Sequence, residues 1–149
     1  MVATNLAALI TRDLEKLKTE ISSYKDEGAL WQIKEGILNS GGNLALHLIG
    51  NLKHYVGFVL GDIPYTRERD KEFSNKNIPV NELLQSIEET IAAVNQTLDQ
   101  ITASDLGNLY PQAVLGYDMT VENFLLHLYG HLNYHLGQVN YHRRLIDGK

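Results

Sequence analysis

Four long segments of this chain repeat apolar residues at spacings of three and four, and this pattern limits the fold class. The segments run over about residues 5–24, 41–60, 79–101 and 121–146. Such spacing places apolar side chains on one face of a helix, where they can pack against other helices. β-branched residues do not alternate over any long stretch, and only residues 110–117 are expected to be extended. The pattern predicts an all-α fold, most simply a four-helix bundle.

Residues at the ends of the four segments support the predicted helix boundaries. Thr4 and Thr120 are expected to be N-caps, because a threonine hydroxyl can accept hydrogen bonds from the free N–H groups of a first turn. Pro79 suits the first turn of the third helix, and Pro64 stops the second. The three connections are longer than most bundle loops, so we expect them to cross the bundle or to form a rim around a site.

Size and composition indicate a single domain over residues 1–149 with a substantial core, since 44% of the residues are hydrophobic. The net charge of −5 argues against nucleic-acid binding. The absence of cysteine excludes a disulfide framework, a thiolate nucleophile and a cysteine zinc site. No apolar stretch is long enough to span a membrane, and no basic region precedes the apolar N-terminal patch. We therefore expect a cytoplasmic protein that does not bind membranes.

Three of the six histidines lie four residues apart, at His127, His131 and His135. This spacing places them on one face of the fourth helix, and imidazole is the commonest metal-ligating side chain. His127 and His135 are separated by about 12 Å along the helix, whereas metal–nitrogen bonds are about 2.0–2.1 Å long. One ion can therefore bind at most two of them, either His127 with His131 or His131 with His135.

A third ligand must come from another helix, and the second helix offers His47 and His54. In an up-down-up-down bundle the second and fourth helices are parallel, and His54 is level with His131 and His135. In an up-down-down-up bundle the two helices are antiparallel, and His47 takes that position. The second arrangement needs a long crossover between helices 2 and 3, and residues 62–78 are long enough to provide it. Spacing alone leaves both arrangements open.

Two motifs resemble the DinB/YfiT-like superfamily of metalloenzymes. The first is the run from Asn43 to Leu52, NLALHLIGNL, and the second is the run from His131 to Gln138, HLNYHLGQ. Residues 65–74, YTRERDKEFS, resemble a branch of the superfamily with no assigned function, and the resemblance covers nearly the whole chain. It implies an up-down-down-up four-helix bundle with a long crossover between helices 2 and 3.

The resemblance also implies that His47, His131 and His135 bind a divalent metal ion, with zinc or nickel expected. Three histidine ligands leave at least one coordination position open for water or substrate, which is typical of a reactive site. Metal binding is the reading that we favour over three hydrogen-bonded core histidines, because each unpaired buried polar group costs about 1–3 kcal/mol.

Other polar residues are expected near the site. Asn51 and Gln138 are each within one turn of a ligand and can accept its free ring N–H or hold bound water; otherwise they are surface amides. His127 is expected to support a ligand or to act as an acid or base one turn from the metal. Tyr134 and Tyr141 are expected to pack in the core.

The charged run from Arg67 to Glu72 has two readings. It can be a solvated loop whose charges pair locally. Alternatively, Arg67 or Arg69 folds over the open metal position and binds a substrate carboxylate.

The chain has no HExxH motif, phosphate-binding glycine loop or nucleophile elbow, so any catalysis must depend on the metal. Characterised members of the similar superfamily include thiol-dependent transferases and isomerases. The resemblance implies a thiol-dependent S-transferase or a hydrolase that acts on a small electrophilic substrate, with a low-molecular-weight thiol as partner. The alternative is a non-catalytic metal-binding or stress-related interaction bundle. Similar proteins are often dimers, and we expect Trp31 to be exposed at the interface of a homodimer.

Overall fold

A computed structural model describes residues 1–148, and these residues are mainly helical. The four long helices are α1 (Val2–Ser22), α2 (Gly41–Leu52), α4 (Val80–Gln100) and α6 (Val121–Asp147). The shorter elements are η1 (Ala29–Trp31), the π-helix η2 (Lys53–Phe58), α3 (Arg69–Ser74) and α5 (Ala103–Gly107). The prediction of an all-α fold is confirmed, and the four long helices lie close to the predicted segments.

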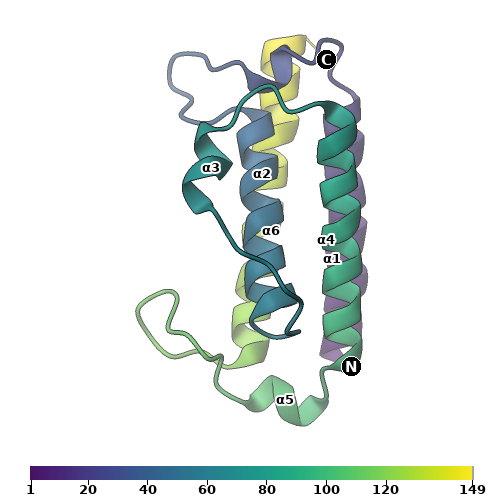
Figure 1. The fold of residues 1–149 in the computed structure, drawn as a ribbon, viewed down its shortest axis with the longest axis vertical. Coiled ribbons are helices and arrows are strands. Elements are labelled where there is room, and N and C mark those ends of the chain that lie inside the picture. Colours follow the sequence, from purple (N-terminus) through teal and green to yellow (C-terminus); the bar gives the residue numbers. More distant parts are fainter. Residues whose placement is uncertain (149) are drawn as a thin grey trace.

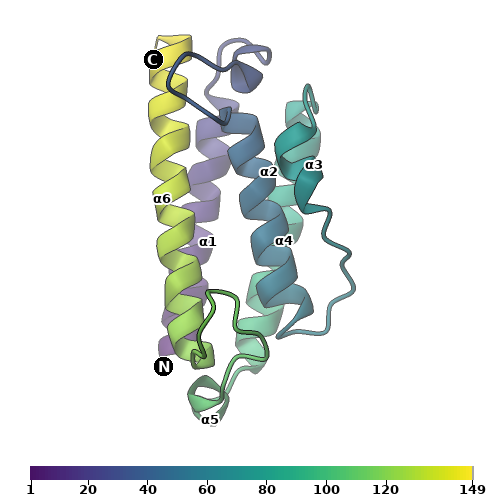
Figure 2. The ribbon, with the colours of Figure 1, turned by 90° about the vertical axis from the view of Figure 1, so that its left-hand side faces the viewer.

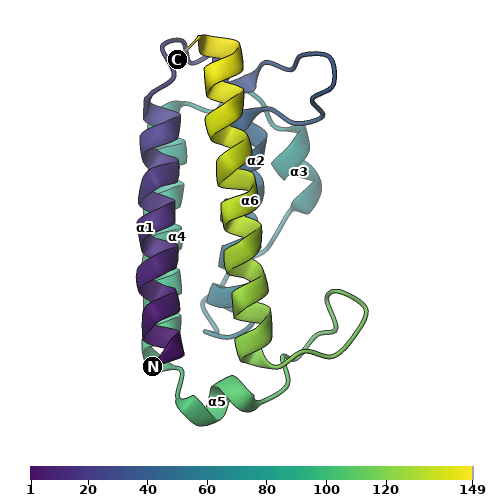
Figure 3. The same cartoon turned by 180° about the vertical axis from the view of Figure 1, so that it is seen from behind.

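The four long helices form a bundle in which α1 and α6 run in one direction and α2 and α4 run in the other (Figures 1 and 3). After η2, the chain returns along the outside of α2 to the start of α4, and α3 lies on this return (Figure 2). The main packing partners are α1 with α4 and α6, and α2 with α6, α4 and α3. This arrangement agrees with the predicted up-down-down-up order and makes α2 and α6 antiparallel.

The structure confirms one of the two predicted N-caps. The Thr120 hydroxyl accepts a hydrogen bond from the Asn123 N–H at 3.1 Å, which confirms the predicted N-cap of α6. Ser40 caps α2 in the same way, through the Asn43 N–H. The N-cap prediction for Thr4 is wrong, because α1 already begins at Val2 and includes Thr4 in its first turn.

The second long helix ends in π-helical turns rather than as a regular α-helix. The Val59 N–H donates to the His54 carbonyl, five residues earlier, and the Tyr55 carbonyl accepts the Tyr110 hydroxyl at 2.7 Å. A side chain from the connection between α5 and α6 thus binds a carbonyl of the widened turns. The expectation of an extended segment over 110–117 is wrong: in this stretch only the Tyr110 N–H makes a strand-like bond, to the Met119 carbonyl.

Three predictions about aromatic residues are also wrong. Trp31 is buried rather than exposed, with 8% of its surface accessible. It packs against Gly42, where a Cβ atom would lie only 2.6 Å from the indole ring, so the close approach requires glycine. Tyr134 and Tyr141 are not core residues, because 67% and 65% of their surfaces are accessible.

The core consists mainly of leucine and isoleucine side chains from all four long helices, and Phe124 is its largest fully buried side chain. Burying one such side chain contributes roughly 1.5–3 kcal/mol, so packing of these helices is the main source of stability. No helix within residues 1–148 has the length and apolar character needed to cross a lipid bilayer.

One buried charge joins α1 to α6. The Asp13 side chain is fully buried and accepts hydrogen bonds from Arg12 Nε at 2.8 Å and from Asn133 Nδ2 at 3.0 Å. Burial alone would raise the pKa of Asp13, but the hydrogen bonds from Arg12 and Asn133 more than offset it and lower the pKa to about 2. The carboxylate therefore stays ionised and links the two helices through charge-assisted hydrogen bonds.

Asp13→Asn should lower the free energy of unfolding at pH 7 by about 1–3 kcal/mol, because Arg12 and Asn133 lose an ionised acceptor. The pKa of Asp13 lies below its ordinary value, so its stabilising effect is present above about pH 4 and lost as the pH falls towards 2. Urea unfolding should show that the difference in the free energy of unfolding between wild type and Asp13→Asn is smaller at pH 3 than at pH 7. Glu15→Gln, at an exposed position on α1, is the control and should change stability by less than about 0.5 kcal/mol. An equal difference in the free energy of unfolding at both pH values would contradict the assignment of Asp13 as an ionised carboxylate.

Candidate metal centre

Three histidines from two helices meet where α2 packs against α6. His47 Nε2 on α2 lies 3.1 Å from His131 Nε2 on α6. The His135 ring centroid is 4.6 Å from that of His131 and 5.3 Å from that of His47. One nitrogen atom from each ring lies within 4.8 Å of the other two. The antiparallel packing of α2 and α6 thus places His47 level with His131 and His135.

The spacing of these nitrogen atoms fits a single small metal ion. Two nitrogen ligands at about 2.0–2.1 Å from a tetrahedral ion are about 3.3 Å apart, close to the separation between His47 Nε2 and His131 Nε2. Three imidazoles form a donor set that suits zinc, nickel and other first-row divalent ions. We name His47, His131 and His135 the histidine cluster.

A buried carboxylate fixes the ring of His47. Glu72 is 6% exposed, and its Oε1 lies 3.0 Å from His47 Nδ1. Arg67 holds the same carboxylate through Nε and Nη2, at 2.8 and 3.0 Å. Burial alone would raise the pKa of Glu72, but the hydrogen bonds from His47 and Arg67 more than offset it, and the pKa is lowered. The ionised carboxylate can only accept, so His47 Nδ1 carries the proton and its Nε2 lone pair faces the cluster.

The helix α3 carries Glu72 to this position on the crossover between α2 and α4. Asn43 on α2 donates its Nδ2 to the Glu72 backbone carbonyl at 2.9 Å, which holds α3 against α2. The Phe73 ring lies against the His47 ring, with centroids 5.0 Å apart. Gly50 makes room for the carboxylate, because a Cβ atom there would lie 1.9 Å from Glu72 Oε2.

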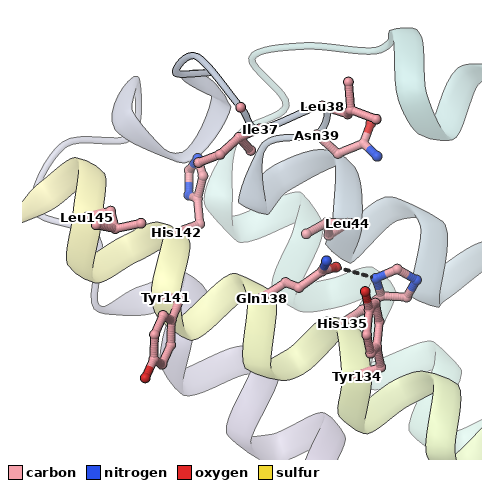
Figure 4. A pocket seen from close by; sticks show the side chains of 11 residues that line it. Ile37, Leu38, Asn39, Leu44, Tyr134, His135, Gln138, Tyr141, His142 and Leu145 are labelled. Carbon is pink, nitrogen blue, oxygen red and sulfur yellow. Dashed lines mark hydrogen bonds between the residues drawn. The ribbon is translucent and has the colours of Figure 1, made fainter.

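An amide fixes the ring of His135. Its Nδ1 lies 2.7 Å from Gln138 Oε1, one turn further along α6 (Figure 4). Because the amide oxygen accepts, the ring proton lies on Nδ1 and the Nε2 lone pair is left for the cluster. Gln138 therefore binds the His135 ring, and its role in supporting a metal ligand stays a prediction.

The cluster is neutral on its α6 side at pH 7. Burial, followed by the neighbouring His135 and His47, lowers the pKa of His131 to about 4. Burial also lowers the pKa of His135, although the hydrogen bond with Gln138 opposes this. Metal ions bind neutral imidazole, so these two side chains need lose no proton before binding at neutral pH.

The other residues singled out from the sequence lie around this centre. Asn51 is buried on α2, and its Oδ1 has no hydrogen-bond partner among residues 1–148. His127 is exposed, and its ring stacks on Phe124 at 5.8 Å and on His131 at 6.4 Å. His54 is half-buried on η2, and burial, followed by the charge of Arg67, lowers its pKa. Neither His54 nor His127 belongs to the group of converging histidine nitrogen atoms.

The two arginines have different environments. Arg67 is nearly buried against Glu72, and its guanidinium lies 5.5 Å from the centre of the Tyr55 ring. Arg69 is exposed and lies 5.8 Å from the centre of the Phe73 ring. Arg67 thus supports the carboxylate beside His47, and the role of either arginine in binding a substrate carboxylate stays a prediction.

Sequence reasoning missed Glu72. Its side chain reaches His47 only because the crossover folds back over α2, and no local pattern reports this contact. Two signals were present: Arg67 and Glu72 lie in one charged run, and Gly50 leaves an open surface on the same helix face as His47.

The chain also matches a known protein family. The family model described as the DinB superfamily matches residues 9–139. The chain belongs to the DinB superfamily, which confirms the resemblance seen in the sequence. No curated protein gives a significant match to the chain.

In the metal-free protein, His47 and His135 should both carry their ring proton on Nδ1. Glu72→Ala removes the acceptor beside His47, so His47 should shift towards the Nε2–H tautomer that unconstrained histidines favour, whereas His135 should not change. Long-range ¹H–¹⁵N correlation spectra distinguish the two tautomers. Glu68→Ala, at an exposed position on the same crossover, is the control and should leave both rings unchanged. A His47 ring that stays protonated on Nδ1 in Glu72→Ala would contradict the assigned role of Glu72.

Proposed function

We propose that this DinB-superfamily protein binds one divalent metal ion, zinc or nickel, through the Nε2 atoms of His47, His131 and His135. The observation that supports the proposal most directly is the convergence of these three rings from α2 and α6. Their nitrogen spacing suits one ion, and the Nδ1 atoms of His47 and His135 already have acceptors in Glu72 and Gln138. In metal sites a ligand histidine usually donates its other ring N–H to a carboxylate, a carbonyl oxygen or water, and Glu72 and Gln138 supply such oxygen atoms here.

Each supporting residue has a distinct task in this proposal. Glu72, held by Arg67, orients the His47 ring and makes its Nε2 more basic. Gln138 orients His135. His131 Nδ1 is buried without a partner among the described residues, so no protein group orients this ring in the way that Glu72 and Gln138 orient the other two.

We further propose that the site serves a thiol-dependent S-transferase or a hydrolase acting on a small electrophilic substrate. When bound, a divalent ion lowers the pKa of a thiol or water ligand and so supplies a nucleophile at neutral pH. Three protein ligands leave room for such a group. The chain has no cysteine, so the thiol would be a separate low-molecular-weight molecule. His127 is an exposed imidazole one turn from His131 and can accept the thiol proton.

The purified protein should bind one equivalent of zinc or nickel after removal of bound ions with chelator. His131→Ala should weaken binding by at least roughly 100-fold, because loss of a ligand costs more than loss of an outer partner. His127→Ala, one turn earlier on the same helix, is the matched control and should bind normally. Calorimetric titration and elemental analysis measure affinity and stoichiometry. Equal binding by wild type and His131→Ala would refute the site.

The metal-loaded protein should also catalyse substitution of an aryl or alkyl halide by a small thiol, which forms a thioether and releases halide and a proton, or hydrolysis of an activated ester. A panel of cysteine, glutathione and neutral thiols, each with and without metal, tests this. Activity should disappear with chelator and in His131→Ala. Stoichiometric metal without any turnover would favour the non-catalytic metal-binding bundle, in which metal only raises the melting temperature by mass action.

A further inference from the structure

A cavity of about 540 Å³ lies directly beside the histidine cluster. One wall is the connection between η1 and α2, at residues 36–39, and the other is the C-terminal half of α6, from Tyr134 to Leu145 (Figure 4). His135 and Gln138 form part of the α6 wall. The cavity therefore adjoins a ring that the proposed metal site uses, and a bound molecule can reach the cluster from it.

The lining of this cavity is mainly apolar and carries no formal charge. None of the residues that line it is Asp, Glu, Lys or Arg. Four large side chains of the lining are exposed, namely Leu38, Tyr134, Tyr141 and Leu145, with Leu38 90% accessible. Large apolar and aromatic side chains gathered around one cavity are typical of a site for an apolar ligand.

Six of the eleven lining residues carry polar side-chain atoms, and some of these atoms are already hydrogen-bonded within the protein. His142 is engaged at both nitrogens, since Nδ1 lies 2.6 Å from the Tyr24 hydroxyl and Nε2 lies 2.8 Å from the Gln32 carbonyl. It therefore offers only its ring face to a ligand. Gln138 uses its Oε1 on His135 and keeps its amide N–H groups as donors at the end of the cavity nearest the cluster.

We propose that this cavity holds the apolar body of an uncharged aromatic or alkyl substrate, with its electrophilic end beside Gln138 and His135. The role of the bound molecule as a substrate rests on the proposed function, but its binding does not. Two cations lie at the rim: Lys34 donates to the Leu145 carbonyl at 3.3 Å, and the Arg144 guanidinium lies 5.3 Å from the centre of the Tyr141 ring. Their presence makes an anionic ligand the main competing occupant.

Binding of a neutral fluorescent probe, N-phenyl-1-naphthylamine, to chelator-treated protein tests the cavity without metal. Leu145→Asp places a charge in the lining and should weaken probe binding by about tenfold or more, on the scale of one buried apolar side chain. Leu126→Asp is the matched control, because Leu126 is also an exposed leucine of α6 but lies outside the lining. It should bind the probe as wild type does.

Two further measurements identify the ligand class and its place. 4-Nitrobenzyl alcohol should displace the probe more effectively than 4-nitrobenzoate, which has a similar ring but carries a negative charge. The alcohol should also shift the ¹⁵N resonances of His135 but not those of His54, which lies on η2 outside the cavity lining.

Equal probe binding by wild type and Leu145→Asp, or stronger displacement by the nitrobenzoate, would overturn the proposal. Light scattering gives a third check: a dimer that Leu145→Asp dissociates would mean that a second copy of the chain covers this surface, which also overturns it. Failure of the proposed function looks different. In that case metal binding is absent while the probe and the alcohol still bind at the cavity.

Discussion

The contact between Glu72 and its two partners, Arg67 and His47, connects the fold of this protein to its candidate site. A buried carboxylate is costly unless it is paired and fully hydrogen-bonded, and here it is held from both sides. Arg67 and Glu72 belong to the crossover, whereas His47 belongs to α2. The pairing that makes burial of Glu72 tolerable therefore also fixes the crossover on α2 and sets the proton position on His47. The contacts that hold the crossover on α2 are thus the same contacts that orient the His47 ring.

Much of the fold and the histidine cluster could be predicted because they depend on regular spacing. The spacing of the apolar residues predicted the four long helices. The rise per residue of a helix showed that His127 and His135 cannot both bind the same ion. Spacing could not choose between His47 and His54, because this choice depends on whether α2 and α6 are antiparallel. The resemblance to the superfamily supplied that topology, and the helix directions agree with it.

The features that escaped prediction depend on contacts between distant segments. Glu72 lies 25 positions from His47 in the chain, and the widened turns of η2 receive the hydroxyl of Tyr110 from a connection 55 positions away. The burial of Trp31 depends on a glycine at position 42 that lets the indole approach the start of α2. Conversely, Tyr134 and Tyr141 are exposed on α6 and line the cavity together with residues 36–39, a contact between segments about 100 positions apart.

If the histidine cluster binds metal as proposed, the charges around it would favour a fourth ligand that is an anion. Three imidazoles contribute no negative charge, and the charge of Glu72 is already balanced by Arg67. A divalent ion held here would keep its full positive charge in a partly buried site, where electrostatic interactions are stronger than in water. Such a site favours a fourth ligand that becomes an anion, such as a thiol that loses its proton. The cavity on the other side of His135 has no charged residue in its lining, and Lys34 and Arg144 lie only at its rim. In the proposed reaction the anionic group would therefore bind at the metal and the apolar group in the cavity.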